Sequence, residues 1–169
     1  MRARLQAEQG FGLIELLISI VMLNVGILAI VAALNSGALA IQRASTTSTA
    51  SVLAEKQMEL YRALSYANIA LLQSAVTTAS SDATYTADAG YSGTQIQTAS
   101  CPGSPTPAQC SPLQTVTGPD GRSYRVDTYI VATTPLNGRA VKRVTVVIHR
   151  PTETKSLARL TSIFDESTG

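Results

Sequence analysis

The sequence predicts an α+β protein in which a long N-terminal α-helix packs on a small C-terminal antiparallel β-sheet. Two observations lead to this fold class: an apolar run from Phe11 to Leu34, and three runs of alternating apolar and polar residues in the last third of the chain. A helix of about 20 apolar residues is long enough to span a bilayer. Alternation with a period of two is typical of half-buried strands. Packing a helix on a sheet buries the apolar face of both.

The length of 169 residues suffices for one membrane segment and one small globular domain. The expected parts are a leader at 1–10, an apolar transmembrane or assembly helix at 11–42, an amphipathic continuation of that helix at 43–72, and a globular domain at 73–169. Within the globular domain we expect a variable loop at 73–122 and the sheet at 123–165.

Charge predicts the orientation of the apolar segment. Arg2 and Arg4 precede it, no charged residue occurs from Leu16 to Gln42, and the next basic residue is Arg43. Basic residues favour the cytoplasmic side of a membrane. We therefore expect a single-pass protein of the cytoplasmic (inner) membrane, with the leader inside and the C-terminal domain outside the cytoplasm.

The junction between leader and apolar run is unusual. A signal peptide is cleaved after its apolar region, whereas here the plausible cleavage site, after Gly10, precedes the run. The mature protein would therefore begin at Phe11 and keep the apolar segment. Glu15 places a carboxylate near the start of that segment, at a cost of about 3 kcal/mol unless it finds a partner. Both features suit a segment that joins a helical assembly; an ordinary signal anchor with a misplaced carboxylate is the alternative.

These residues carry a family resemblance. MRARLQAEQG followed by FGLIELLISIVMLNVGILAIVAAL resembles the leader and N-terminal helix of type IV pilins and of the pseudopilins of type II secretion. The resemblance implies cleavage after Gly10 by a prepilin peptidase, N-methylation of Phe11, and pairing of Glu15 with the N-terminal amine of a neighbouring subunit. It also implies partners: other pilin subunits, the inner-membrane assembly platform, and membrane lipid before assembly.

Two stretches, LIELLISIVMLNVGILAI and AEKQMELYRALSY, look like the corresponding parts of PilV-type minor pilins. This likeness implies a minor subunit that is built into a pilus or primes its assembly at the cell surface, for adhesion, motility or DNA uptake. A minor pseudopilin of type II secretion remains an alternative. A signal-anchored extracytoplasmic enzyme or binding domain is a third, more distant one.

The helix is expected to run for about fifty residues. A glycine in a helix costs about 1 kcal/mol relative to alanine, so a bend or local melting is expected near Gly26 and Gly37. Beyond them an apolar stripe at helical spacing predicts packing on the sheet. The stripe consists of Leu53, Gln57, Leu60, Tyr61 and Leu64.

Three strands are predicted after a turn at 118–121: Ser123–Thr133, Val141–His149 and Ser156–Phe164. Asn137-Gly138 between the first two is a strong hairpin signal. For the third run a short helix is the alternative. The preceding stretch, rich in Ser, Thr, Ala, Gly and Pro, is expected to be loop, with short strands at Thr84–Thr86 and Thr94–Thr98.

Cys101 and Cys110 are the only cysteines, and an extracytoplasmic compartment favours a disulfide between them. Closing this ten-residue loop would contribute about 2.7 kcal/mol; two free buried thiols are the alternative. No metal site or cofactor is expected, because the single histidine, His149, lies in a different segment.

Enzyme and nucleic-acid signals are weak. His149 is expected to be a structural or surface residue, and the GxSxG, GxGxxG and HExxH motifs are absent from the sequence. We therefore expect no enzymatic activity. Thirteen basic against eleven acidic residues give a net charge of +2, too small for a nucleic-acid footprint. Six basic residues are expected on solvated strand faces and edges, not in a DNA-binding patch: Arg122, Arg125, Arg139, Lys142, Arg143 and Arg150.

Overall fold

The computed structural model describes residues 12–101, 103, 106–136 and 138–168. Gly10 and Phe11, the predicted cleavage and methylation positions, lie outside the described residues. The chain divides into two compact units, Met1–Arg43 and Ala44–Gly169.

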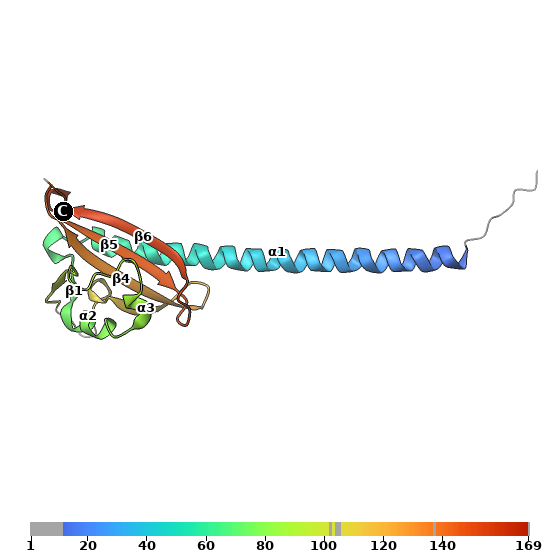
Figure 1. Ribbon diagram of the computed structural model, residues 1–169, viewed down its shortest axis with the longest axis horizontal. Helices are drawn as coiled ribbons and strands as arrows, with labels where there is room; N and C mark the ends of the chain where they lie inside the picture. Colours follow the sequence, from blue (N-terminus) through green and yellow to red (C-terminus); the bar gives the residue numbers. More distant parts are fainter. Residues whose placement is uncertain (1–11, 102, 104–105, 137, 169) are drawn as a thin grey trace, which may run out of the picture. The chain divides into compact units, whose positions relative to one another are not determined.

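A single 50-residue helix, α1 (Leu13–Arg62), contributes its first part to one unit and its last part to the other (Figure 1). The helical assignment continues through Gly26 and Gly37, so the expected local melting is wrong. Adding a residue to an existing helix costs little compared with starting one, and both glycines lie well inside the 50-residue helix. The helix ends at Arg62, ten residues before the expected boundary at 72. The chain then forms a short 3₁₀ turn, η1 (Tyr66–Asn68).

The second unit contains a four-stranded antiparallel sheet with the order β3-β4-β5-β6. Its strands are β3 (Leu113–Thr117), β4 (Ser123–Thr133), β5 (Val141–His149) and β6 (Ser156–Asp165). The three predicted strands are confirmed as β4, β5 and β6, and the short-helix alternative for the last is wrong. Strand β3 lies in the stretch expected to be loop. A long N-terminal helix with an antiparallel sheet is the predicted α+β class.

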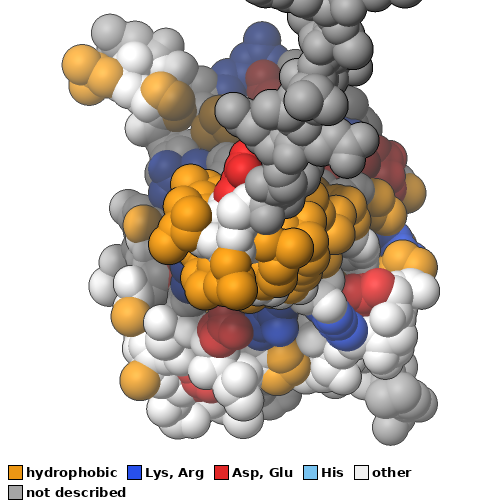
Figure 2. Space-filling model, turned by 90° about the vertical axis from the view of Figure 1, so that its right-hand side faces the viewer, with side chains coloured by type: hydrophobic (Ala, Val, Ile, Leu, Met, Phe, Trp, Pro, Cys, Tyr) orange, Lys and Arg blue, Asp and Glu red, His pale blue; other side chains and the backbone are white. Residues whose placement is uncertain are grey.

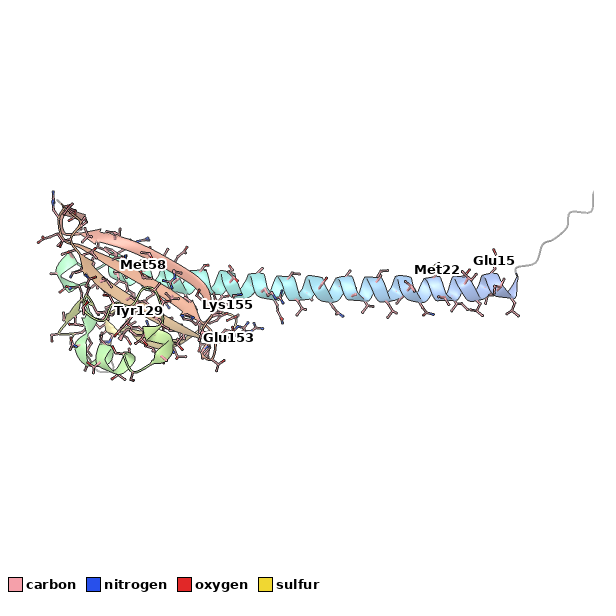
Figure 3. The ribbon with its side chains drawn as sticks, in the orientation of Figure 1. Glu15, Met22, Met58, Tyr129, Glu153 and Lys155 are labelled. Carbon is pink, nitrogen blue, oxygen red and sulfur yellow. A yellow bond between two sulfur atoms is a disulfide. The ribbon has the colours of Figure 1, made fainter. Side chains whose placement is uncertain are left out.

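One face of the sheet, here called the inner face, packs against the last part of α1. Met58 and Tyr61 of the helix are fully buried there, and Figure 3 labels Met58 near the end of α1, where helix and sheet overlap in the view. The sheet contributes mainly β-branched residues to the same cluster, which include Val126, Ile130, Val144 and Val146. The alternation predicted for the strands thus places their apolar side chains in this core.

The opposite, outer face is covered by the segment between α1 and β3. This segment contains α2 (Gln73–Ala79), α3 (Ala83–Thr86) and a two-residue parallel pair of β1 (Leu71–Leu72) with β2 (Thr98–Ala99). The Tyr85 ring stacks on Tyr129 with centroids 4.5 Å apart. The Tyr85 hydroxyl donates to the Thr128 carbonyl oxygen, 2.9 Å away.

Two short strands expected in this segment are corrected. Residues 84–86 are helical because the Asp82 side chain caps α3, accepting hydrogen bonds from the Thr84 and Tyr85 amides at 2.8 and 3.0 Å. In the stretch expected at 94–98 only Thr98 belongs to a strand, and Ile96 forms one isolated bridge to Val131.

Candidate functional site

The first unit offers an exposed apolar helix. Every residue from Gly12 to Arg43 is exposed, and Figure 2 shows hydrophobic side chains gathered around this helix. By length and composition α1 is the one helix among the described residues that could cross a membrane, and none of its most apolar window is buried. Burying apolar surface contributes roughly 25 cal/mol per Å². This part of α1 therefore meets the requirements of a membrane anchor or of a helix that packs against other helices.

Glu15 lies in the first turn of α1. Its backbone amide donates to the Gly12 carbonyl oxygen at 2.9 Å, and its own carbonyl oxygen accepts from Ser19 Oγ at 2.8 Å. Figure 3 places Glu15 near the beginning of the helix, on the same side as Met22 seven residues later. Among the described residues its carboxylate has no ion-pair partner, so it is available to a group from another molecule.

The second unit contains a cluster of charged residues on the outer face of the sheet, which was not predicted. Arg125 Nη1 lies 2.9 Å from Asp82 Oδ2, and Arg125 Nε lies 2.8 Å from Asp127 Oδ1. His149 Nε2 lies 3.7 Å from the second oxygen of Asp127. The β4–β5 register brings them together, because Arg125 is opposite His149. Asp127 is fully buried.

The two carboxyl groups of this cluster respond differently to their surroundings. The hydrogen-bonded guanidinium of Arg125 lowers the pKa of Asp82. Burial raises the pKa of Asp127, although Arg125 acts in the opposite direction. The cluster therefore ties the cap of α3 to the sheet through Arg125. The strand pattern alone placed Arg125 on a solvent face, because it could not show that the segment 70–110 covers that face.

The basic residues do not form one patch. Arg125 is 9% exposed and Lys142 is 7% exposed, so the expectation of a solvated surface position is wrong for both. Lys142 Nζ donates to the carbonyl oxygens of Tyr66 and Ile69 at 2.7 and 2.9 Å, and it lies 4.6 Å from the centre of the Tyr66 ring. Lys142 therefore satisfies backbone acceptors where the chain leaves α1.

The predicted disulfide between Cys101 and Cys110 is present, with the two Cα atoms 6.3 Å apart. Among the described residues, no group of three or more His, Cys, Asp or Glu side chains is placed to hold a metal ion.

Two cavities in the second unit, as the described residues line them, do not assemble a recognisable catalytic group. A cavity of about 480 Å³ lies between α2 and β3, with Asp82 in its wall. A second, of about 330 Å³, is lined by His149 together with Thr84, Asp88 and Thr154. Neither ring nitrogen of His149 has a hydrogen-bond partner in the described structure, so no hydroxyl there is paired with it as a nucleophile would be.

The chain matches no protein-family model, no curated protein and no solved structure.

Proposed function

We propose that this protein is a minor type IV pilin, a structural subunit that enters a pilus or primes its assembly. The observation that carries the proposal is the exposed apolar part of α1, with one carboxylate in its first turn. This part follows a junction, Gly10-Phe11, that resembles a prepilin cleavage site. The same helix continues into a part that packs one side against an antiparallel sheet.

In this proposal the helix lies first in the membrane and later in the filament. It first holds the subunit in the inner membrane, with the sheet domain outside the cytoplasm, where the Cys101–Cys110 disulfide is stable. Prepilin peptidase cleaves after Gly10, and the new terminal residue, Phe11, is methylated. The helix then leaves the lipid and packs against the helices of neighbouring subunits, where Gly26 and Gly37 allow close approach.

Glu15 supplies the specificity of docking. A single carboxylate and a single N-terminal amine are each costly in an apolar medium, at about 3 kcal/mol for a charged side chain at the centre of a membrane helix. Pairing the Glu15 carboxylate of one subunit with the Phe11 amine of its neighbour removes both costs. Such pairing also fixes the axial position of one helix relative to the other.

Maturation provides the first test. Intact-mass measurement and N-terminal sequencing of the membrane-extracted protein are expected to show a chain that begins at methylated Phe11. Substitution of Gly10 by leucine (Gly10→Leu) should block processing, because the peptidase requires a small residue before the cleaved bond. A wild-type protein that retains Met1, or normal maturation of the Gly10→Leu variant, would contradict the assignment.

Assembly provides the second test. The Glu15→Ala variant should be processed normally, but its recovery in filaments sheared from the cells should fall by at least about tenfold, since losing a pair worth more than about 1.4 kcal/mol has that effect. Glu55→Ala is the matched control, because Glu55 is an exposed carboxylate on the same helix but in the second unit. Wild-type recovery of the Glu15 variant would remove the pairing argument.

The sheared fraction also separates a pilus from a secretion apparatus. A pilin is expected in filaments released from the cell surface. Retention of the mature protein in the cell envelope, together with failure of a deletion strain to secrete exoproteins, would instead identify a pseudopilin of type II secretion.

A further inference from the structure

The sheet of the second unit has two edge strands, β3 and β6. Strand β6 pairs with β5 alone and β3 pairs with β4 alone. No residue of either edge strand is fully buried, whereas most of β4 and β5 is. One side of each edge backbone is therefore without a strand partner among the described residues. Such edges are templates for pairing with another chain unless they are protected.

Strand β6 lacks the usual protection along its regular part. A register shift at Ile148/His149 marks a bulge near its start, after which Ala158 to Asp165 pair regularly with β5. No proline interrupts that stretch, and its one basic residue, Arg159, is ion-paired with Asp88 of the same chain. Ile163 is 66% exposed. Neither a bulge nor an unpaired basic residue therefore protects the seven-residue edge 158–164 from pairing with another strand.

Strand β3 of a second copy fits this edge in direction. The four strands alternate in direction along the sheet, so β6 and β3 run opposite to each other. Pairing β6 with β3 of a second copy continues the antiparallel pattern while both copies keep the same orientation. If β6 of one copy paired with β6 of another, the two copies would instead be antiparallel, and their α1 helices would run in opposite directions.

The faces of the two strands determine which registers are possible. On β3, Val116 faces the inner core, and its partner on β4 is Tyr124. On β6, Leu160 faces the same core, opposite Val146. A register that places Leu160 beside Val116 therefore keeps inner residues with inner residues, and a shift by one residue would reverse every side chain.

In this register four of the five residues of β3 meet a residue of the same class on β6, apolar with apolar or uncharged polar with uncharged polar, and the fifth, Thr117, lies beside Arg159. The cross-strand pairs are Leu160 with Val116, Ile163 with Leu113, Thr161 with Thr115, Ser162 with Gln114, and Arg159 with Thr117. Apolar pairs and threonine pairs of this kind stabilise antiparallel strands. A shift by two residues in one direction puts Leu160 beside Gln114, and in the other direction puts Asp165 beside Leu113. Of these three registers, only the matched one has no such conflict.

We propose that β6 of one copy pairs with β3 of a second copy in this register, so that the sheet continues from subunit to subunit. This contact is heterologous and does not close on itself, so it can propagate along a row of co-oriented subunits. The proposal goes beyond the docking of the N-terminal helix. It concerns the second unit and does not depend on cleavage at Gly10 or on the Glu15 pair.

Cysteine cross-linking of the full-length chain in lipid vesicles tests the register. Chains carrying Thr161→Cys are mixed with chains carrying Thr115→Cys and treated with a thiol cross-linker that spans about 5 Å, the separation of directly opposite side chains. Both positions are exposed, and the native cysteines are already joined to each other. Within one chain the two positions lie on opposite edges of four strands, at least about 14 Å apart, so a cross-link joins two chains.

The mixture is expected to give at least about tenfold more cross-linked dimer than Thr161→Cys alone, because docked thiols have a far higher effective concentration than colliding ones. Chains that carry both cysteines should give a ladder of multimers. The matched control replaces Thr115→Cys by Thr117→Cys, two residues out of register. Equal yields from the mixture and the control, or efficient cross-linking of Thr161→Cys with itself, would overturn the proposal.

A second measurement uses the charge at Arg159. In the proposed register Thr117 lies beside Arg159, so Thr117→Glu on the chain with Thr115→Cys should raise the cross-linking yield, and Thr117→Lys should lower it. The yield with the opposite-charge pair should be about fivefold higher than the yield with the like-charge pair. Identical yields from the Thr117→Glu and Thr117→Lys chains would also overturn the register.

Discussion

At the residue scale, Asp82 is both a helix cap and an ion-pair partner. Its Oδ1 accepts from two backbone amides of α3, and its carboxylate pairs with Arg125. Asparagine caps a helix as well as aspartate does, so Asp82→Asn keeps the cap and removes the charge. This substitution therefore separates the two roles of a single side chain.

We expect Asp82→Asn to lower the free energy of unfolding at pH 7 by less than about 1 kcal/mol, since partly exposed ion pairs are weak. Because the pKa of Asp82 is lowered in the folded state, its contribution is complete above the unfolded value, near pH 4, and is lost as pH falls further. The variant should therefore lose less stability than the wild type between pH 6 and pH 3.

Denaturant unfolding of the detergent-solubilised chain at several pH values measures this difference. Asp127, whose pKa is raised, contributes in the opposite direction, but it is present in both proteins and largely cancels in the comparison. Glu55→Gln, at an exposed carboxylate without an ion-pair partner among the described residues, is the control and should follow the wild type. Parallel curves for Asp82→Asn and wild type would show that the pair contributes nothing.

At the scale of elements, local pattern predicted the strands that form the inner core. β4, β5 and β6 alternate apolar and polar residues, and that pattern is set by neighbours two residues apart. The long helix was predicted for the same reason, because its apolar run is continuous. Its end at Arg62 was not, since η1 depends on contacts of Tyr66 and Ile69 with Lys142, more than seventy residues later.

The segment between α1 and β4 could not be predicted from local pattern. Residues 84–86 are of the kinds that favour strands, but the cap provided by Asp82 and the stacking of Tyr85 on Tyr129 hold them as a helix. Likewise Arg125 has the position of a solvent-facing strand residue, and its burial depends on Asp82, 43 residues earlier. Long-range contacts decided both outcomes, and a single sequence does not reveal such contacts.

The candidate site, too, was predicted from the sequence only in part. The sequence predicted an uncharged helix with Glu15 near its start and a disulfide between Cys101 and Cys110, and both features are present. The chemistry at Gly10 and Phe11 remains a prediction. The charged cluster around Arg125 was missed, and the signal that could have suggested it is weak: two oppositely charged residues, Arg125 and Asp127, two apart on one strand.

At the scale of the whole molecule, the second unit contains a complete core. Its first buried residue is Thr46, and the inner cluster draws only on residues from Ala50 onwards. We therefore expect a chain limited to residues 44–169 to fold without the apolar part of α1. Circular dichroism and thermal unfolding should show a cooperative transition, whereas a gradual transition would show that the core needs the rest of the helix.

The buried aromatic residues give this unit an optical signature of its own. The protein has no tryptophan, and Tyr61, Tyr85, Tyr124 and Tyr129 are all almost completely buried. Burial raises the pKa of all four phenols, that of Tyr61 to about 12. Exposed phenols ionise near pH 10. In an alkaline titration these four tyrosines should stay un-ionised beyond that pH and should not yet add to the absorbance near 295 nm. The late rise in absorbance would then report the opening of the core itself, without any added label.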